Sequence, residues 1–298
     1  YRNTKNVPYY VFGRGSLAQL GDLLKPRREA VDGPVVYFVD HFFRDHELIG
    51  RLPMEKGASP FVDSSSEPEV TRIDAFKEAV SAADSRTPCC VVGIGGGNAL
   101  DTAKAVANLL TNPGKAEDYQ GWELVKSPAV YKIGIPTLSG TGSECSRTCV
   151  LTNIPKNLKL GMNSDYTVYD QLLLDPDLLA TVPRDQYFYT GIDTFMHCVE
   201  SLQAAPQRHH RRLLRTRRAA LRGNFLSDDM MSEENREKMM IASYIGGMAA
   251  GNVGVSDPFS AGLGVVLHVA HGLGNCLALN VLGTSPQEYK QFRTMIER

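Results

Sequence analysis

The 298-residue sequence has no apolar run approaching the roughly 20 residues that cross a bilayer, and no excess of charge of either sign. Lysine and arginine number 32 and aspartate and glutamate 33, which gives a formal net charge of −1. A nearly neutral chain has no overall field that would draw it to a polyanion. We therefore expect neither a membrane nor a nucleic acid as a partner.

Cysteine is also scarce, and its spacing forms no recognisable pattern. The six cysteines include no C-x-x-C pair and no dense framework of the disulfide-rich type. The first residues lack the charged-then-apolar layout of a signal peptide. Reduced thiols in the cytoplasm are the expectation that fits both observations.

Strand-like and helix-like segments alternate over about the first 184 residues. The strand-like runs are Val35–Val39, Cys89–Ile94, Tyr131–Ile135 and Leu172–Leu174, and the helix-like ones are Glu67–Ala83 and Ala99–Leu110. This order predicts a parallel sheet with helices on both faces. After Pro183 the strand signals fade. We predict two domains: an α/β dinucleotide-binding domain over residues 1–184 and an all-helical metal- and substrate-binding domain over residues 185–298.

A glycine-rich turn, Gly93–Asn98, stands between a buried strand and a helix. Glycine lets the backbone approach a ligand, and the helix N-terminus that follows suits a pyrophosphate. We expect Gly95, Gly96, Gly97 and Asn98 to bind a dinucleotide. Asp40 ends an earlier strand, where its carboxylate could bind an adenosine ribose and repel a 2′-phosphate, which favours NAD over NADP. The alternative is that the glycines only form a tight βα turn and that Asp40 is a helix N-cap.

A second loop, Pro136–Glu144, also follows a buried strand and is rich in hydroxyl groups and glycine. Two such loops at strand ends are typical of the nucleotide crevice of α/β sheets. The hydroxyl-bearing candidates for cofactor contacts are Thr137, Ser139, Thr141 and Ser143.

Asp193 and His197 lie four residues apart in Thr190–Leu202, a segment with helical spacing. Residues at i and i+4 share one helix face, so both side chains could reach one ion. A carboxylate and an imidazole suit Fe²⁺ or Zn²⁺. An ordinary surface pair is the alternative. His271, next to Gly272, supplies a further imidazole, whereas we interpret His268 as a partly buried helix residue.

Several segments resemble the iron-containing (group III) alcohol dehydrogenase family, which shares its fold with dehydroquinate synthase. They run in family order: Phe12–Gly15, Gly95–Asn98 with Asp101 and Lys104, Pro136–Glu144, Lys159–Gly161, Asp175-Pro176, Asp193-x-x-x-His197 and His271-Gly272. The resemblance implies a dehydroquinate synthase-like α/β + α fold. It also implies an oxidoreductase that passes hydride from a primary alcohol to NAD with the help of a divalent metal. We further expect a homo-oligomer, in the form of a dimer.

The resemblance carries four metal ligands to this sequence: Asp193, His197, His271 and the residue fourteen positions before His271. That residue is Asp257, where the family has histidine. A carboxylate can still bind the ion, although a second anionic ligand lowers its Lewis acidity. The resemblance adds Asp101 and Lys159 to the cofactor-binding residues. Lys159 is expected at the cofactor ribose or the substrate, with a surface lysine as the alternative.

Within the family, some stretches are most similar to the 3-deoxy-D-manno-octulosonate (Kdo) 8-oxidases: Asp118–Trp122, Leu158–Asp170, Val182–Leu202 and Asp257–Gly264. Those enzymes oxidise the terminal primary alcohol of an acidic eight-carbon sugar to an aldehyde. The resemblance thus implies a small sugar acid or other alcohol as substrate. The alternatives are a lyase like dehydroquinate synthase on the same scaffold, and a catalytically impaired relic that binds nucleotide only.

Two features depart from the family pattern. The chain ends at Arg298, short of a usual member, so we expect a helical domain that is truncated. The stretch Gln207–Arg222 carries seven arginines. An anion-binding patch, a solvated helix face or a locally altered reading frame would each account for it.

Overall fold

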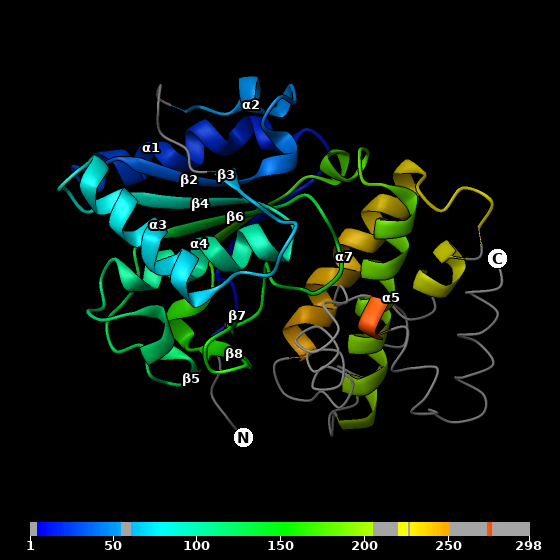
Figure 1. Ribbon diagram of the computed structural model, residues 1–298. Helices are drawn as coiled ribbons and strands as arrows, with labels where there is room; N and C mark the ends of the chain where they lie inside the picture. The colour runs from blue at the N-terminus through cyan, green and yellow to red at the C-terminus, as the bar shows by residue number, and fades with distance from the viewer. Residues whose placement is uncertain (1–4, 55–60, 205–219, 226, 251–272, 276–298) are drawn as a thin grey trace. The chain divides into compact units, whose positions relative to one another are not determined.

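The computed structural model describes residues 5–54, 61–204, 220–225, 227–250 and 273–275 (Figure 1). Its contacts divide the chain into two compact units. The first unit comprises residues 1–137 and 143–175, and the second comprises residues 138–142 and 176–298. The longer segment of the second unit begins at Pro176, and residue 184, near which the sequence suggested a boundary, lies within this segment at the start of a helix.

The first unit is built on a six-stranded parallel sheet. Its strands are β1 (Tyr9–Phe12), β2 (Val35–Asp40), β3 (Phe61–Val62), β4 (Cys90–Gly95), β6 (Lys132–Pro136) and β9 (Gln171–Leu174), in the order β1-β9-β6-β4-β2-β3. Strands β4 and β6 are buried along their whole length. Continuous apolar runs of this kind are typical of strands covered on both faces, and the parallel sheet expected from the sequence is confirmed.

Helices cover both faces of this sheet. They are α1 (Leu20–Ala30), α2 (Leu48–Arg51), α3 (Val70–Ala83) and α4 (Gly97–Leu109), with 3-10 turns η1 (Ser16–Gln19), η2 (His41–Phe43), η3 (Ala116–Tyr119) and η4 (Asp165–Thr167). Helix α1 lies on one face, and α3 and α4 lie on the other (Figure 1). Helix α4 is buried from Ala99 to Leu109 because it packs between the large sheet and a second, smaller one.

The smaller sheet was not expected from the sequence. It contains β5 (Gly121–Trp122), β8 (Leu158–Asn163) and β7 (Thr148–Asn153) in that order, with β7 and β8 antiparallel. Buried and half-buried residues alternate along β7, as in a strand with one covered face. An alternation this short, between polar residues, is a weak signal in a sequence.

The described part of the second unit is helical and contains no strand. It comprises η5 (Pro176–Leu179), α5 (Arg184–Ala204), α7 (Glu233–Ala250) and short helical pieces at residues 220–225 and 273–275. Helices α5 and α7 pack together. The Tyr187 hydroxyl of α5 donates to the Asn235 carbonyl of α7 at 3.2 Å, and its burial raises the pKa of Tyr187 to about 12.

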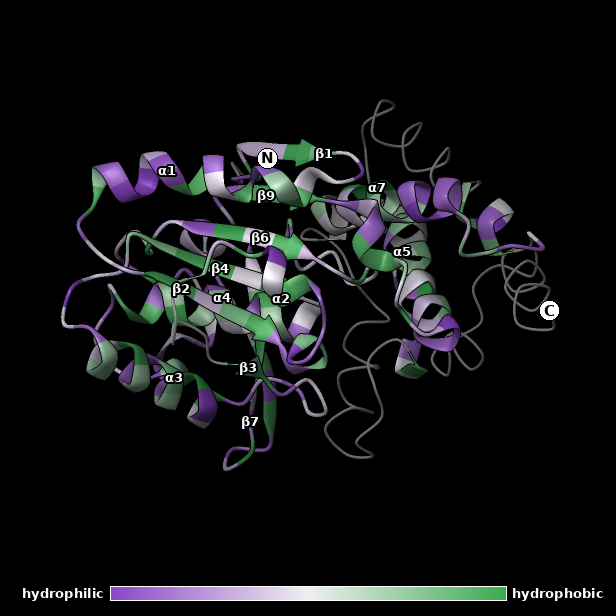
Figure 2. Cartoon of the chain, turned by 90° about the horizontal axis from the view of Figure 1, so that it is seen from above, coloured by the Kyte–Doolittle hydropathy of each residue, from purple (hydrophilic) through white to green (hydrophobic). Residues whose placement is uncertain are grey.

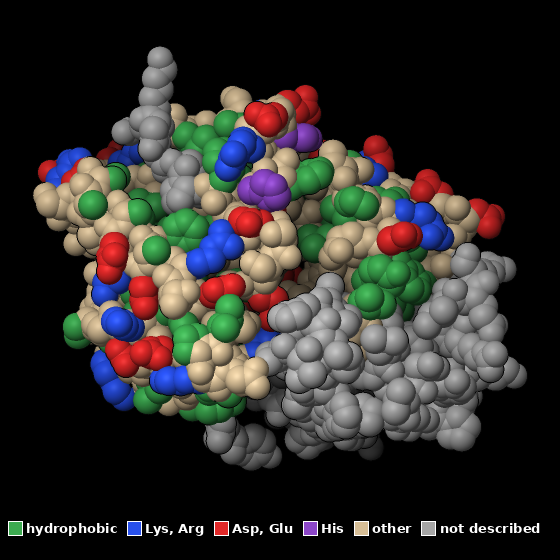
Figure 3. Space-filling view, in the orientation of Figure 1, with side chains coloured by type: hydrophobic (Ala, Val, Ile, Leu, Met, Phe, Trp, Pro, Cys, Tyr) green, Lys and Arg blue, Asp and Glu red, His purple; other side chains and the backbone are tan. Residues whose placement is uncertain are grey.

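Two observations concern the surface. No helix within the described ranges is long and apolar enough to span a bilayer. On the face seen in Figure 3, acidic and basic side chains are interspersed over the described residues. That mixture matches the balance of charges in the sequence.

Candidate functional site

The glycine-rich turn joins β4 to α4 at the carboxyl end of the parallel strands. Gly95 ends β4 with φ +150°. A Cβ on Gly95 would lie 2.7 Å from Cβ of Ala99 and 2.8 Å from Cβ of Asp40. Only glycine therefore lets the end of β4 pack this closely against both α4 and β2.

The first turn of α4 is open to an anion. Gly96 is the N-cap residue, so no side chain caps the helix, and the first turn contains no acidic residue. The N–H groups at a helix N-terminus bind phosphate through hydrogen bonds and the helix dipole. The chemistry of this turn therefore fits the pyrophosphate of NAD, and the roles of Gly95, Gly96 and Gly97 as cofactor residues stay a prediction.

The other two residues predicted for this part of the site are tied together by a segment that the sequence reasoning overlooked. Ser64 donates its hydroxyl to Oδ1 of Asp40 at 2.8 Å. Asn98 donates its side-chain amide to the carbonyls of Ser66 at 2.9 Å and Ser64 at 3.3 Å. Asp40 also accepts from the N–H of Phe42 and caps η2. The N-cap role that the sequence left open for Asp40 is thus present in the structure.

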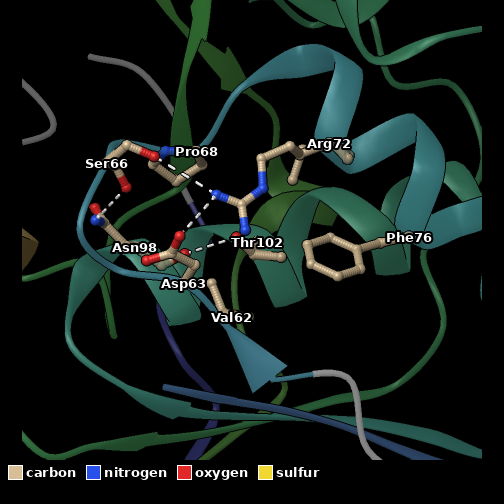
Figure 4. A pocket seen from close by; sticks show the side chains of 9 residues that line it. Val62, Asp63, Ser66, Pro68, Arg72, Phe76, Asn98 and Thr102 are labelled. Atoms are coloured by element: carbon tan, nitrogen blue, oxygen red, sulfur yellow. Dashed lines mark hydrogen bonds and ion pairs between the residues drawn. The ribbon is translucent and has the colours of Figure 1, made fainter. Parts of the chain in front are cut away.

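Figure 4 shows the surroundings of Asn98 and Ser66. A depression of about 220 Å³, including space open to solvent, is lined there by side chains of α3 and α4 and of the segment after β3. The Arg72 guanidinium lies 3.9 Å from the Asp63 carboxylate beside it. The run Asp63-Ser64-Ser65-Ser66-Glu67-Pro68 was the available sequence signal, because clustered polar residues after a strand often bind backbone or ligand groups.

Lys159, predicted as a cofactor or substrate contact, lies on β8 and forms an ion pair with Glu67. Its side chain is 9% exposed, so it is not the surface lysine of the alternative interpretation. Glu67 also accepts a hydrogen bond from the Thr152 hydroxyl at 3.2 Å. The pair connects the smaller sheet to the segment that holds Asn98.

Asp101 and Ser143, both predicted cofactor residues, bind each other. The Ser143 hydroxyl donates to Asp101, which also accepts from the N–H of Val150 at 2.9 Å. Burial raises the pKa of Asp101, and the ammonium of Lys104 at 3.9 Å and these hydrogen bonds oppose that rise. Lys104, fully buried, donates to the carbonyls of Ser143, Ser146 and Thr148. Together these contacts hold the segment that begins at Ser143, where the chain returns from the second unit to the first.

The hydroxyl-rich loop is divided between the two units. Thr137 and Ser143 belong to the first, whereas Leu138–Gly142, with Ser139 and Thr141, belongs to the second. Thr137 donates its N–H to the Gly95 carbonyl at 3.0 Å. Ser139 is buried and Thr141 is partly exposed. Two of the predicted cofactor contacts of this loop, Thr137 and Ser143, therefore belong to the first unit, and the other two belong to the second.

Within the second unit, Leu138–Gly142 is anchored on α5 and α7. The Gly140 N–H donates to the Ser243 hydroxyl at 3.0 Å, and the Gly140 carbonyl accepts from the Thr194 hydroxyl at 2.9 Å. A Cβ on Gly140 would lie 2.5 Å from Cβ of Thr190, and one on Gly142 would lie 2.3 Å from Cα of Gly247. Glycine is thus required here for the backbone to contact the helices.

Asp193 and His197 share one face of α5, as their spacing predicted. Both side chains are buried, and His197 Nε2 lies 3.7 Å from Asp193 Oδ1. Two ligand atoms each about 2.1 Å from one ion, at a tetrahedral angle, are about 3.4 Å apart. The pair therefore fits a divalent metal in both its chemistry and its separation.

A third residue, Asn275, was not predicted. Its side-chain amide, fully buried, donates a hydrogen bond to Oδ1 of Asp193. Its own Oδ1 has no hydrogen-bond partner in the part of the chain that the structure describes. The signal in the sequence was its position four residues after His271, since residues four apart share a helix face.

The other predicted ligands, Asp257 and His271, lie outside the described residues, as do His268 and residues 205–219 of the arginine-rich stretch. Across the described ranges, no group of three or more His, Cys, Asp or Glu side chains could hold a metal ion. The described portion of the predicted metal site is therefore the pair Asp193 and His197.

Two family models match this sequence. One is iron-containing alcohol dehydrogenase, over residues 8–176, and the other is the C-terminal part of the Fe-containing alcohol dehydrogenase family, over residues 187–293. The chain belongs to the iron-containing alcohol dehydrogenase family. The family expectation from the sequence is confirmed, and with it an oxidoreductase family that acts on CH–OH groups.

Curated members of the family are similar to the chain over much of its length. Sulfoacetaldehyde reductase of Bilophila wadsworthia is 33% identical over 218 residues, which are 72% of this chain and 56% of the relative. NAD-dependent methanol dehydrogenase of Bacillus methanolicus is 26% identical over 278 residues, 91% of this chain and 70% of the relative. The chain thus matches little more than half the length of the first relative.

Solved structures of the family have the same fold. Sulfoacetaldehyde reductase from Bifidobacterium kashiwanohense, in complex with NAD⁺, has a TM-score of 0.80 and 25% identity. The match covers 99% of this chain and 81% of the reductase chain. A 1,3-propanediol oxidoreductase has a TM-score of 0.82 and 21% identity, with coverages of 100% and 80%. The dehydroquinate synthase-like α/β + α fold expected from the sequence is confirmed.

Proposed function

We propose that this protein is an NAD-linked, metal-assisted oxidoreductase that interconverts an acidic primary alcohol and its aldehyde. The observation that carries the proposal is the buried pair Asp193 and His197, with the Asn275 amide fixed on the carboxylate. A buried carboxylate is costly unless a cation or hydrogen bonds compensate it. The open first turn of α4 supports the cofactor half of the proposal.

Asp193 and His197 would hold the metal, with Asp257 and His271 as the further ligands. When bound, a divalent iron or zinc ion supplies Lewis-acid polarisation of the alcohol oxygen, and NAD supplies the hydride acceptor. The Asn275 N–H orients the Asp193 carboxylate. The N–H groups after Gly96 would bind the pyrophosphate, and Asp40 the adenosine ribose.

Two lines of similarity favour an acidic substrate. The sulfoacetaldehyde reductases are named for an anionic aldehyde, and the stretches similar to the Kdo 8-oxidases point to a sugar carboxylate. We propose oxidation of the C8 hydroxyl of Kdo as the specific reaction, with reduction of a short acidic aldehyde as the competing one. Methanol serves as the uncharged substrate for comparison, because the chain is also similar to an NAD-dependent methanol dehydrogenase.

Kinetics on the purified chain test the substrate. NADH should form with Kdo and NAD, or disappear with sulfoacetaldehyde, at a kcat/KM at least about tenfold above that for methanol or 1-propanol. Turnover restricted to neutral alcohols would contradict the acidic substrate. Release of inorganic phosphate from a phosphate-bearing substrate would indicate the lyase instead. Retained NAD binding without metal or turnover would indicate a relic.

Metal analysis tests the site independently of turnover. The purified protein should contain close to one iron or zinc ion per chain, and Asp193→Ala should lose it. Asp185→Ala is the matched control, since Asp185 lies on the same helix with an 80% exposed side chain. Asp257→His should retain or raise the metal content. Equal metal in wild type and Asp193→Ala would place the ion elsewhere.

A further inference from the structure

Three neighbouring strands of the large sheet end next to one another at the proposed cofactor turn. Strand β2 lies between β4 and β3 (Figure 2). Gly95 ends β4, Asp40 ends β2, and Ser64 lies just after β3. Because these strands are parallel, their carboxyl ends meet at one edge of the sheet, where α/β proteins bind ligands. Asp40 thus stands between the glycine-rich turn and Ser64, which lies outside the predicted set of binding residues.

The two carboxylate oxygens of Asp40 have different surroundings. The Ser64 hydroxyl donates to Oδ1 at 2.8 Å, and the N–H of Phe42 donates to the same oxygen at 3.1 Å. A carboxylate oxygen accepts about two hydrogen bonds. The acceptor capacity of Oδ1 is therefore filled, whereas Oδ2 accepts no hydrogen bond from the residues that the structure describes. The oxygen that is left for a ligand is Oδ2.

The Ser64 hydroxyl is not needed to hold its own segment in place. The side-chain amide of Asn98 already binds the main chain there, at the carbonyls of Ser66 at 2.9 Å and Ser64 at 3.3 Å. The hydroxyl acts instead on the Asp40 side chain. The last torsion of an aspartate side chain is broad, so rotamer preference alone does not fix the plane of its carboxylate. A second donor on Oδ1 restricts that rotation.

We propose that Ser64 is a positioning residue for coenzyme selection: by holding Oδ1 of Asp40, it keeps Oδ2 available to the adenosine ribose and so sets the preference for NAD over NADP. This role rests on the proposed binding of NAD at the first turn of α4. It adds to that proposal a residue that acts through Asp40 and does not itself contact the coenzyme.

The two coenzymes make opposite demands on this carboxylate. The ribose hydroxyls of NAD are donors, and the lone pairs of Oδ2 can accept from them. NADP carries a 2′-phosphate, which a carboxylate repels and which an arginine usually accommodates. The arginine beside this segment, Arg72, is directed to the Asp63 carboxylate at 3.9 Å and the Ser66 hydroxyl at 3.5 Å. A carboxylate that is held in place therefore discriminates more strongly than one that can rotate away from the phosphate.

Dissociation constants for NAD and NADP, measured by calorimetry on the purified chain, test this role independently of turnover. Ser64→Ala should weaken NAD binding by about three- to tenfold and NADP binding less, because the released carboxylate can rotate away from a 2′-phosphate. Ser64→Thr keeps the hydroxyl and should retain the NAD preference of the wild type. Ser65→Ala is the matched control, since the Ser65 hydroxyl binds Asp63 at 2.6 Å, and it should leave both affinities unchanged.

A double-mutant cycle tests whether Ser64 acts through Asp40. Asp40→Ala should itself reduce the preference for NAD, and adding Ser64→Ala to it should then have no further effect on NAD affinity. Equal losses for both coenzymes in Ser64→Ala, or an effect of Ser64→Ala that persists without Asp40, would overturn the positioning role alone. A folded wild type that binds neither coenzyme would overturn the NAD-linked function and this role with it. Circular dichroism checks that each variant is folded.

Discussion

Glu67 and Lys159 form an ion pair between residues 92 positions apart in the sequence, and it joins the segment before α3 to β8. The lysine side chain is 9% exposed and the carboxylate 29%. Through Ser66 and Asn98 this segment also reaches the start of α4. The position of a predicted cofactor contact thus depends on a residue outside the predicted set.

Removing the charge of Glu67 should therefore weaken the first unit. We expect Glu67→Gln to lower the free energy of unfolding by about 1 kcal/mol, between the values for exposed and buried pairs. A double-mutant cycle with Lys159→Met, measured by urea unfolding, should give a coupling energy of similar size. Thr152→Val is the control, since it removes only the hydrogen bond of Thr152 to Glu67. Additive effects would show that the ion pair contributes nothing.

Gly142, in the hydroxyl-rich loop, and Gly15, in the turn after β1, have the same backbone conformation but different surroundings. Their φ angles are +70° and +71°. A Cβ would clash with Gly247 at Gly142, but would meet nothing within 4 Å at Gly15. We expect Gly15→Ala to lower the free energy of unfolding by about 1–2 kcal/mol, because the left-handed backbone conformation alone is unfavourable for alanine. Gly142→Ala should lower the free energy of unfolding by about 1–3 kcal/mol more than Gly15→Ala does, because the added Cβ also clashes with Gly247.

Thermal or urea unfolding of the two glycine variants measures that difference. Because Gly142 packs on helices of the second unit, proteolysis of that unit should also accelerate in Gly142→Ala. Equal losses of stability in the two variants would mean that the loop can move away from α7 at no cost.

The features that the sequence predicted are those fixed by neighbours along the chain. A buried apolar run that ends in glycines specified β4, the turn and α4. The i, i+4 spacing specified that Asp193 and His197 share a face of α5, because helix geometry alone sets it. Strand ends differed by one residue from the expected bounds, as at Tyr131–Ile135 against Lys132–Pro136.

The features that the sequence left undetermined are partners distant along the chain. Asp101 and Ser143 stay predicted cofactor residues, and the hydrogen bond that joins them across 42 residues was not part of the prediction. Nothing local in the sequence shows which buried carboxylate a hydroxyl group of the loop will bind. The role of Ser64–Glu67 depends in the same way on which elements the sheet order brings beside it.

Asn275 should act on the metal through Asp193. Its amide donates to the carboxylate of Asp193, and residues that orient metal ligands typically change affinity by about 10- to 100-fold. We therefore expect Asn275→Ala to lower metal affinity by that factor in competition with a chelator. Asn275→Gln is the conservative variant. Asn224→Ala is the control, because Asn224 is equally buried in the second unit but binds Tyr187 and Asn235. Unchanged affinity in Asn275→Ala would contradict the positioning role.

Lys132 should make the stability of the first unit change with pH in the alkaline range. Burial lowers the pKa of Lys132 from its ordinary value of 10.5 to about 8, with the attraction of Asp170 opposing this. The groups that face it are the Tyr166 carbonyl and Asp170, with Lys5 and Lys104 nearby. Between pH 8 and pH 10.5 the unfolded chain therefore binds the proton that the folded chain has lost.

Stability linked to this group should accordingly rise with pH across that window, by up to about 3 kcal/mol. Lys132→Met, which has no charge to bury, should lack this contribution. The difference in urea midpoint between wild type and Lys132→Met should therefore move in favour of the wild type from pH 7 to pH 10. Lys126→Met, on a lysine whose ammonium donates to the exposed Glu123 carbonyl, should show no such trend. A difference that stays constant with pH would mean that Lys132 keeps an ordinary pKa when folded.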